Sequence, residues 1–141
     1  MAEHLDEIKL HPLYLSRKEK EILLKQYKRE RRQGTVDPEI AKYLNRINSF
    51  RWVATIRSCQ GHGYPGHVSL RFSRKAHRLF MEDGIKVLLE KRLCQVWLEA
   101  GLWLPTQTGI YFRWKIRFPE EKRDEFFRVL LKWLNKIDKQ I

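Results

Sequence analysis

Residues 56–67, IRSCQGHGYPGH, combine one of the two cysteines, two of the five histidines and three of the seven glycines of the chain. Cys59 lies between Arg57 and His62, and an electropositive setting favours the reactive thiolate form of a cysteine. His62 is placed to act as its base, although a nucleophilic thiol normally needs a base that a third group orients. The structural alternative is that Cys59 is a small buried residue at the end of a strand.

Phosphate binding and metal binding fit this loop less well than a reactive or buried cysteine does. The loop leads from one expected strand into another, whereas glycine loops that bind phosphate lead from a strand into a helix. Cys59, His62 and His67 are possible metal ligands, but a structural zinc site has four, so that Cys94 or His77 would have to complete the set. The recognised cysteine–histidine spacings are absent. We therefore predict no metal site.

The charge balance indicates a polyanionic partner. The chain of 141 residues has 29 Lys and Arg against 17 Asp and Glu, a net charge of +12 and an isoelectric point of about 10.0. Such an excess favours phosphate contacts and counterion release. A charged thermophilic surface would explain many charges but not their imbalance. We expect nucleic acid, RNA in particular, or another phosphate-rich molecule as the partner.

Three features indicate a soluble cytoplasmic protein without membrane association. The start, MAEHLDEIKLHPLYLS, lacks the basic and apolar regions of a secretory signal. No apolar run approaches the roughly 20 residues that a membrane-spanning helix needs. Two cysteines are too few for a disulfide framework, and in a reducing compartment both are thiols. The sequence leaves the oligomeric state open.

Helix signals occur in four segments. Ser16 and Glu19 form a capping box, and Gly34 suits the position after a helix end. Asp37 fits an N-cap and Pro38 the first helical position of the next helix. Gly84 is a weak point within the third segment, since glycine costs about 1 kcal/mol against alanine in a helix. The expected helices are 16–32, 37–48, 76–92 and 119–139.

Strand signals alternate with these helices at 51–57, 67–72, 94–104 and 110–118. The order ααββαββα predicts a single α+β domain over residues 1–141, with 1–15 as a loosely packed N-terminal segment. A mainly antiparallel sheet of about four strands, covered by helices on one face, would bury every apolar stripe. The opposite face would remain open to solvent or a partner.

The period of two along a strand identifies the residues of this open face. Cations there would contact phosphates, and flat aromatic rings would stack on unpaired bases, as in proteins that bind single-stranded RNA. The alternative is an ordinary solvated face on which the N-terminal helix covers Trp97 and Trp103. The expected nucleic-acid-binding residues are Arg57, Arg71, Trp97, Tyr111, Arg113, Lys115 and Arg117, with Glu99 and Trp103 on the same face.

Two short motifs suggest a family. Thr35, Val36 and Asp37 follow a Lys-rich helix in the segment QGTVD, and residues 57–62 read RSCQGH after a strand. The stretch LSRKEKEILLKQYKRERRQGTVDPEIAKYLNRINSFRWVATIRSCQGH resembles the N-terminal part of the wybutosine-synthesising tRNA methyltransferases, the third enzymes of that pathway. That family has KGSVD, a helix ending in IN, and SSCSGR in the same order.

The resemblance implies an α+β fold and a tRNA-type substrate. The family transfers a methyl group from S-adenosylmethionine to a hypermodified guanosine beside the anticodon of phenylalanine tRNA. Asp37, Ser58 and Cys59 match the motifs, His62 stands where the family has arginine, and these four are the catalytic residues that we expect from the resemblance. In this reading Asp37 offers a carboxylate, Ser58 and His62 donate hydrogen bonds, and Gly61 allows a backbone to approach a ligand closely.

Overall fold

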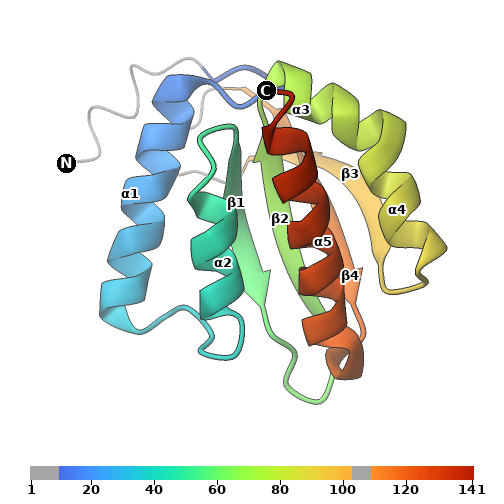
Figure 1. Cartoon of the computed structure of the whole chain (residues 1–141). Coiled ribbons are helices and arrows are strands. Elements are labelled where there is room, and N and C mark those ends of the chain that lie inside the picture. Colours follow the sequence, from blue (N-terminus) through green and yellow to red (C-terminus); the bar gives the residue numbers. More distant parts are fainter. Residues whose placement is uncertain (1–9, 103–108) are drawn as a thin grey trace.

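Four antiparallel strands form one sheet in the order β1-β2-β4-β3, which confirms the α+β prediction. The computed structural model describes residues 10–102 and 109–141 (Figure 1). Trp103 lies outside these described residues. The strands are β1 (Val53–Cys59), β2 (Gly66–Phe72), β3 (Gln95–Gly101) and β4 (Tyr111–Phe118).

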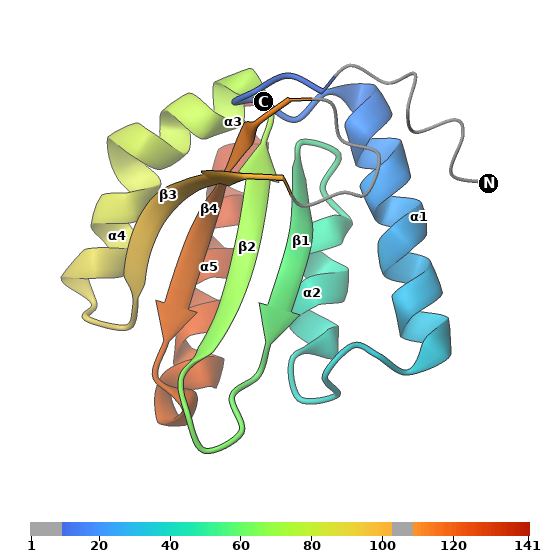
Figure 2. The same cartoon turned by 180° about the vertical axis from the view of Figure 1, so that it is seen from behind.

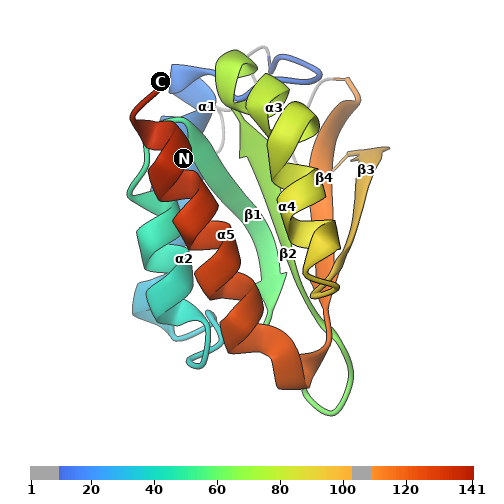
Figure 3. The same cartoon turned by 45° about the vertical axis from the view of Figure 1, so that its right-hand side comes forward.

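Most helices lie on one face of the sheet. α2 (Ala41–Asn48) and α5 (Arg123–Asp138) cross this face, and α3 (Arg74–Leu79) and α4 (Ile85–Glu90) lie on the same side (Figures 1 and 3). α1 (Arg17–Gln33) instead runs along the outer edge of β1, as the view from behind shows (Figure 2). In these views α2, α3, α4 and α5 share one side of the sheet, whereas α1 lies at its edge.

The core lies between the sheet and the helices on this face. Alternation along β2 and β4 sends one set of side chains toward the helices, and the stripe along α5 meets it. The residues buried there include Val68, Leu70, Phe72, Trp114, Ile116, Phe118, Phe126, Phe127, Leu130, Leu134 and Ile137.

Two helix boundaries differ from the prediction. The third helix is interrupted by a π-helical turn, Phe80–Gly84, where a Cβ on Gly84 would lie 2.6 Å from Phe80 and 2.8 Å from Trp133. Glycine thus permits close packing there. The second helix begins at Ala41, and Asp37 is not its N-cap, because its carboxylate contacts the loop after β1 instead.

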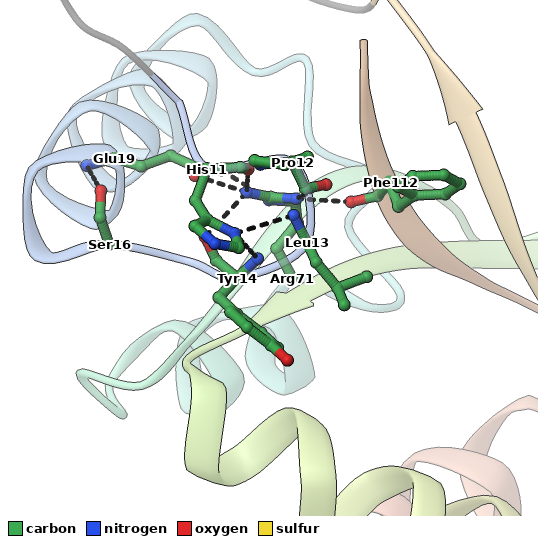
Figure 4. Close-up of polar contacts among 8 residues, drawn as sticks. All are labelled: His11, Pro12, Leu13, Tyr14, Ser16, Glu19, Arg71 and Phe112. Carbon is green, nitrogen blue, oxygen red and sulfur yellow. Dashed lines mark hydrogen bonds and ion pairs between the residues drawn. The ribbon is translucent and has the colours of Figure 1, made fainter.

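The segment before α1 is more firmly held than predicted. The backbone amide of Leu15 donates to Phe72 (2.8 Å), and that of Phe112 donates to Pro12 (2.8 Å). Arg71 donates to the carbonyl oxygens of His11 and Tyr14 (Figure 4). Residues 10–15 are therefore part of the folded domain. Within the described ranges, no helix has the length and apolar character needed to cross a membrane.

Candidate functional site

Three of the four predicted catalytic residues meet at one end of the sheet. Cys59 ends β1, His62 lies in the loop that follows, and Asp37 lies in the turn before α2. The His62 Nε2 atom is 3.4 Å from Asp37 Oδ2. One ligand atom from each of the three residues lies within 4.8 Å of the other two. We call these three residues the Asp–Cys–His cluster. Ser58 pairs with Val68 and so lies on the other face of β1.

Hydrogen bonds to neighbouring segments hold the loop of the cluster in place. The backbone amide of Gln60 donates to Asp37 Oδ2 (2.9 Å), and that of Gly63 donates to Glu120 Oε2 (2.7 Å). Gly61 has φ +96°, and a Cβ there would lie 2.7 Å from the carbonyl oxygen of Tyr64. The left-handed conformation and the close approach together require glycine at position 61.

A groove of about 300 Å³ between α1 and β1 adjoins the cluster. Val36 and Ser58 line it, and each immediately precedes a cluster residue in the chain. Burial raises the pKa of Glu30, which Arg29 and Arg57 partly oppose. We call this the α1–β1 groove, and its lining is Leu23, Gln26, Tyr27, Glu30, Thr35, Val36, Thr55, Ile56, Arg57, Ser58 and His67.

A row of polar side chains crosses the sheet face that is turned away from α2 and α5. His67 is paired with Cys59 on one side and with Arg117 on the other, so all three side chains point to this face. In the next row Lys115 is paired with Trp97, and its Nζ atom lies 5.9 Å from the centre of the Trp97 ring. We call His67, Lys115, Arg117 and Trp97 the basic strip.

Burial and the charged side chains around the basic strip shift the pKa of His67. Burial lowers the pKa of His67, and the nearby Lys115, Arg113 and Arg57 lower it further, while Glu99 opposes them. The exposed side chain of Arg57 thus lies close enough to extend the basic strip toward the α1–β1 groove. His67 is consequently neutral at pH 7, and the positive charge of the strip comes from lysine and arginine.

Three predicted nucleic-acid contacts are wrong, because their side chains are buried. Arg71 is only 1% exposed, forms an ion pair with Glu19 at 2.8 Å and stacks on Tyr111 at 4.3 Å. Tyr111 is also 1% exposed. Arg113 is 7% exposed and pairs with Glu99 at 2.8 Å. Residues 10–15 and the start of α1 cover the end of the face that holds Arg71 (Figure 4).

Trp97 remains accessible. It is 37% exposed, so α1 does not cover it as the alternative interpretation expected. The period of two therefore assigned the correct face to Arg71, Tyr111 and Trp97, and only the cover over one end of that face was missed.

Sequence reasoning also missed three residues that shape the site. Tyr64 places its hydroxyl 4.0 Å from Cys59 Sγ, and this contact raises the pKa of Tyr64. Its place within the glycine-rich loop was a signal that could have found it. Glu120 acts on the loop from a distant part of the chain, and no local pattern indicates that contact. Glu19 was recognised only as a capping residue, but its buried carboxylate is also the partner of Arg71. An arginine on a buried part of a strand needs such an anion, and this was the signal that could have found Glu19.

Comparison of the chain with models of protein families, with curated proteins and with solved structures finds no match. The chemistry of the site is nevertheless specific. The cluster offers a carboxylate, a thiol and an imidazole at one point. The basic strip offers cations and an aromatic ring on the same side of the sheet, suited to phosphates and bases.

Proposed function

We propose that this chain binds RNA, and a tRNA in particular, on the basic strip, and that the Asp–Cys–His cluster acts on a nucleotide held beside it. The observation that carries the proposal is the register of the sheet. Cys59, His67 and Arg117 are neighbours on three adjacent strands and point to one face. An RNA strand bound to the basic strip would therefore pass the Asp–Cys–His cluster.

Different residues of the basic strip would bind different parts of the RNA. Lys115 and Arg117 supply positive charge for phosphates, and releasing their counterions favours binding. Trp97 offers a flat surface to an unpaired base, and such stacking contributes about 1–3 kcal/mol per base. The net charge of +12 adds long-range attraction for any polyanion.

The resemblance to the wybutosine-synthesising tRNA methyltransferases extends the proposal to S-adenosylmethionine as methyl donor. The α1–β1 groove fits the chemical groups of this donor: Glu30 suits an ammonium or hydroxyl group, Arg57 a carboxylate, and Leu23 an apolar part. The donor would supply an electrophilic methyl group. Asp37 and His62, which lie 3.4 Å apart, would accept the proton that the nucleotide loses. A cytoplasmic location belongs to the same proposal.

A second candidate is a non-catalytic RNA-binding module on the same fold. The exposure of the cluster favours it, because the side chain of His62 is 49% exposed and water therefore reaches the site freely. This function predicts that Cys59→Ala and His62→Ala leave RNA affinity intact and that no methyl transfer occurs.

Titration calorimetry with tRNA and with S-adenosylmethionine tests these proposals. The double variant Lys115→Glu/Arg117→Glu should weaken tRNA binding and reduce the slope of log affinity against log salt by about 0.7–0.9 for each phosphate that the strip no longer neutralises. Lys132→Glu/Lys136→Glu changes the same charge on exposed positions of α5, across the sheet, and is the matched control.

Each outcome has one meaning. Equal effects of the two double variants would show that binding depends on net charge alone and would contradict the basic strip. A weak salt slope for the unmodified chain would contradict electrostatic RNA binding. Absence of heat from S-adenosylmethionine, with tRNA binding intact, would remove methyl transfer and leave the RNA-binding module.

A further inference from the structure

We infer that Asp37, Cys59 and His62 together bind a divalent metal ion of the zinc type. A thiol, an imidazole and a carboxylate, each with one ligand atom, lie within 4.8 Å of one another. They come from two segments more than twenty residues apart, the turn before α2 and the end of β1 with its loop. This site does not depend on the proposed RNA binding. It is an alternative to the proton-accepting role of Asp37 and His62, because an imidazole that binds a metal through its free nitrogen cannot also accept a proton.

The arrangement of the three atoms is a closed triangle. In a catalytic relay of carboxylate, imidazole and thiol, the imidazole lies between the other two groups and keeps them apart. Here the Asp37 oxygen and the Cys59 sulfur also lie within 4.8 Å of each other, so His62 does not separate them. Three groups that converge on one point are arranged as ligands of a shared cation.

The size of the triangle suits zinc. Three points no more than 4.8 Å apart all lie within 4.8/√3, or about 2.8 Å, of a common centre. Zinc bonds measure about 2.3 Å to sulfur and about 2.0–2.2 Å to nitrogen and oxygen. Side-chain movements of at most about 0.8 Å therefore complete the site, and His62, which is half exposed, has room to make them.

The charges and ligand types balance those of the ion. A thiolate and a carboxylate carry two negative charges, the neutral imidazole carries none, and sulfur with nitrogen favours zinc over magnesium or calcium. Three protein ligands leave the fourth tetrahedral position open, as in catalytic zinc sites.

The carboxylate of the site is already oriented. Asp37 Oδ2 accepts the backbone amide of Gln60 at 2.9 Å, and outer hydrogen bonds of this kind fix the direction of a ligand before the metal arrives. From the sequence we predict no metal site, with Cys59, His62 and His67 as the possible ligands. The structure replaces His67 with Asp37, which lies far upstream and belongs to no recognised spacing.

The test uses the full chain, stripped of metal with a chelator and titrated with zinc alone and with cobalt(II) alone. We expect one ion per chain, and a cobalt spectrum with a thiolate charge-transfer band and the intense visible bands of tetrahedral coordination. Cys59→Ser and Asp37→Asn should each weaken zinc binding at least tenfold. Cys94→Ser removes the other cysteine and should bind zinc normally. Burial raises the pKa of the Cys94 thiol to about 11.

Either of two results would overturn the inference, one from the unmodified chain and one from the variants. A cobalt spectrum without the thiolate band, or zinc binding that Cys59→Ser and Asp37→Asn leave unchanged, would exclude the site. Circular dichroism of the metal-free variants separates ligand loss from unfolding. Calorimetry with tRNA in the presence of chelator separates this inference from the proposed function, since the basic strip needs no metal.

Discussion

Arg71 and Glu19 form a two-pronged ion pair inside the protein, with the Nε and Nη2 atoms of Arg71 each 2.8 Å from a different carboxylate oxygen. Their side chains are 0% and 1% exposed. Arg71 donates further hydrogen bonds to the carbonyl oxygens of Pro12 and Phe112 (Figure 4). The pair thus joins α1, β2, β4 and the segment before α1. It also closes one end of the open face.

Replacing Arg71 with methionine should lower the free energy of unfolding by about 3–5 kcal/mol, because it leaves the Glu19 carboxylate buried without its partner. Urea denaturation measures this change. The double variant Glu19→Gln/Arg71→Met should recover part of the loss, since it removes the buried charge as well. The tRNA affinity of the folded protein should not change. Normal stability with weakened tRNA binding would instead restore Arg71 as a direct RNA contact.

Trp97→Leu should weaken RNA binding by about 1–3 kcal/mol and leave its salt dependence unchanged, because it removes a stacking surface but no charge. Affinity for a single-stranded oligonucleotide, measured at several salt concentrations, checks both parts. Leu98→Ala is the matched control, because Leu98 is the next residue on β3, is 38% exposed and points to the other face. Equal losses for the two variants would contradict stacking on Trp97.

Features that depend on neighbouring residues in the sequence were predicted correctly, whereas contacts between distant segments were missed. Strict alternation along β4 is a local property, so it correctly placed Lys115 and Arg117 together on one face. Alternation says nothing of what covers a face, so it failed for Arg71, whose cover comes from a segment about 60 residues away. Local spacing likewise favoured Asp37 as a helix cap, whereas its partners lie on a loop that only the tertiary fold brings near.

RNA affinity should rise as the pH falls from about 7.5 to about 5.5, and His67→Gln should reduce this dependence. Burial and the neighbouring Lys115 and Arg113 lower the pKa of His67 in the free protein. Bound phosphates offset those positive charges, so the pKa of His67 rises on binding and the complex takes up a proton. Each unit of this rise strengthens binding by up to about tenfold at low pH.

Dissociation constants at constant ionic strength measure the effect of His67. The His62→Gln variant serves as the comparison, because it removes a nearby histidine that lies in the loop after β1 and outside the basic strip. If His67→Gln keeps the full pH dependence and His62→Gln abolishes it, the proton belongs to the cluster, and the phosphates do not reach the middle of the sheet.

Gly61→Ala and Gly63→Ala should separate backbone strain from a steric clash in the loop of the cluster. Both glycines have positive φ, +96° and +85°, so each substitution should cost about 1–3 kcal/mol in stability through strain. Only at Gly61 would the new Cβ also meet Tyr64 and Glu120, at 2.7 and 3.1 Å. Among the described residues other than its two chain neighbours, no atom lies within 4 Å of a Cβ at Gly63.

Gly61→Ala should therefore shift the loop that carries His62 and lower zinc affinity at least tenfold, whereas Gly63→Ala should lower it far less. Urea denaturation and zinc titration of both variants give the two quantities side by side. A similar loss of zinc affinity in both would mean that general loosening of the loop is responsible. Unchanged zinc affinity in Gly61→Ala would mean that the close contact between Gly61 and Tyr64 does not determine where His62 lies.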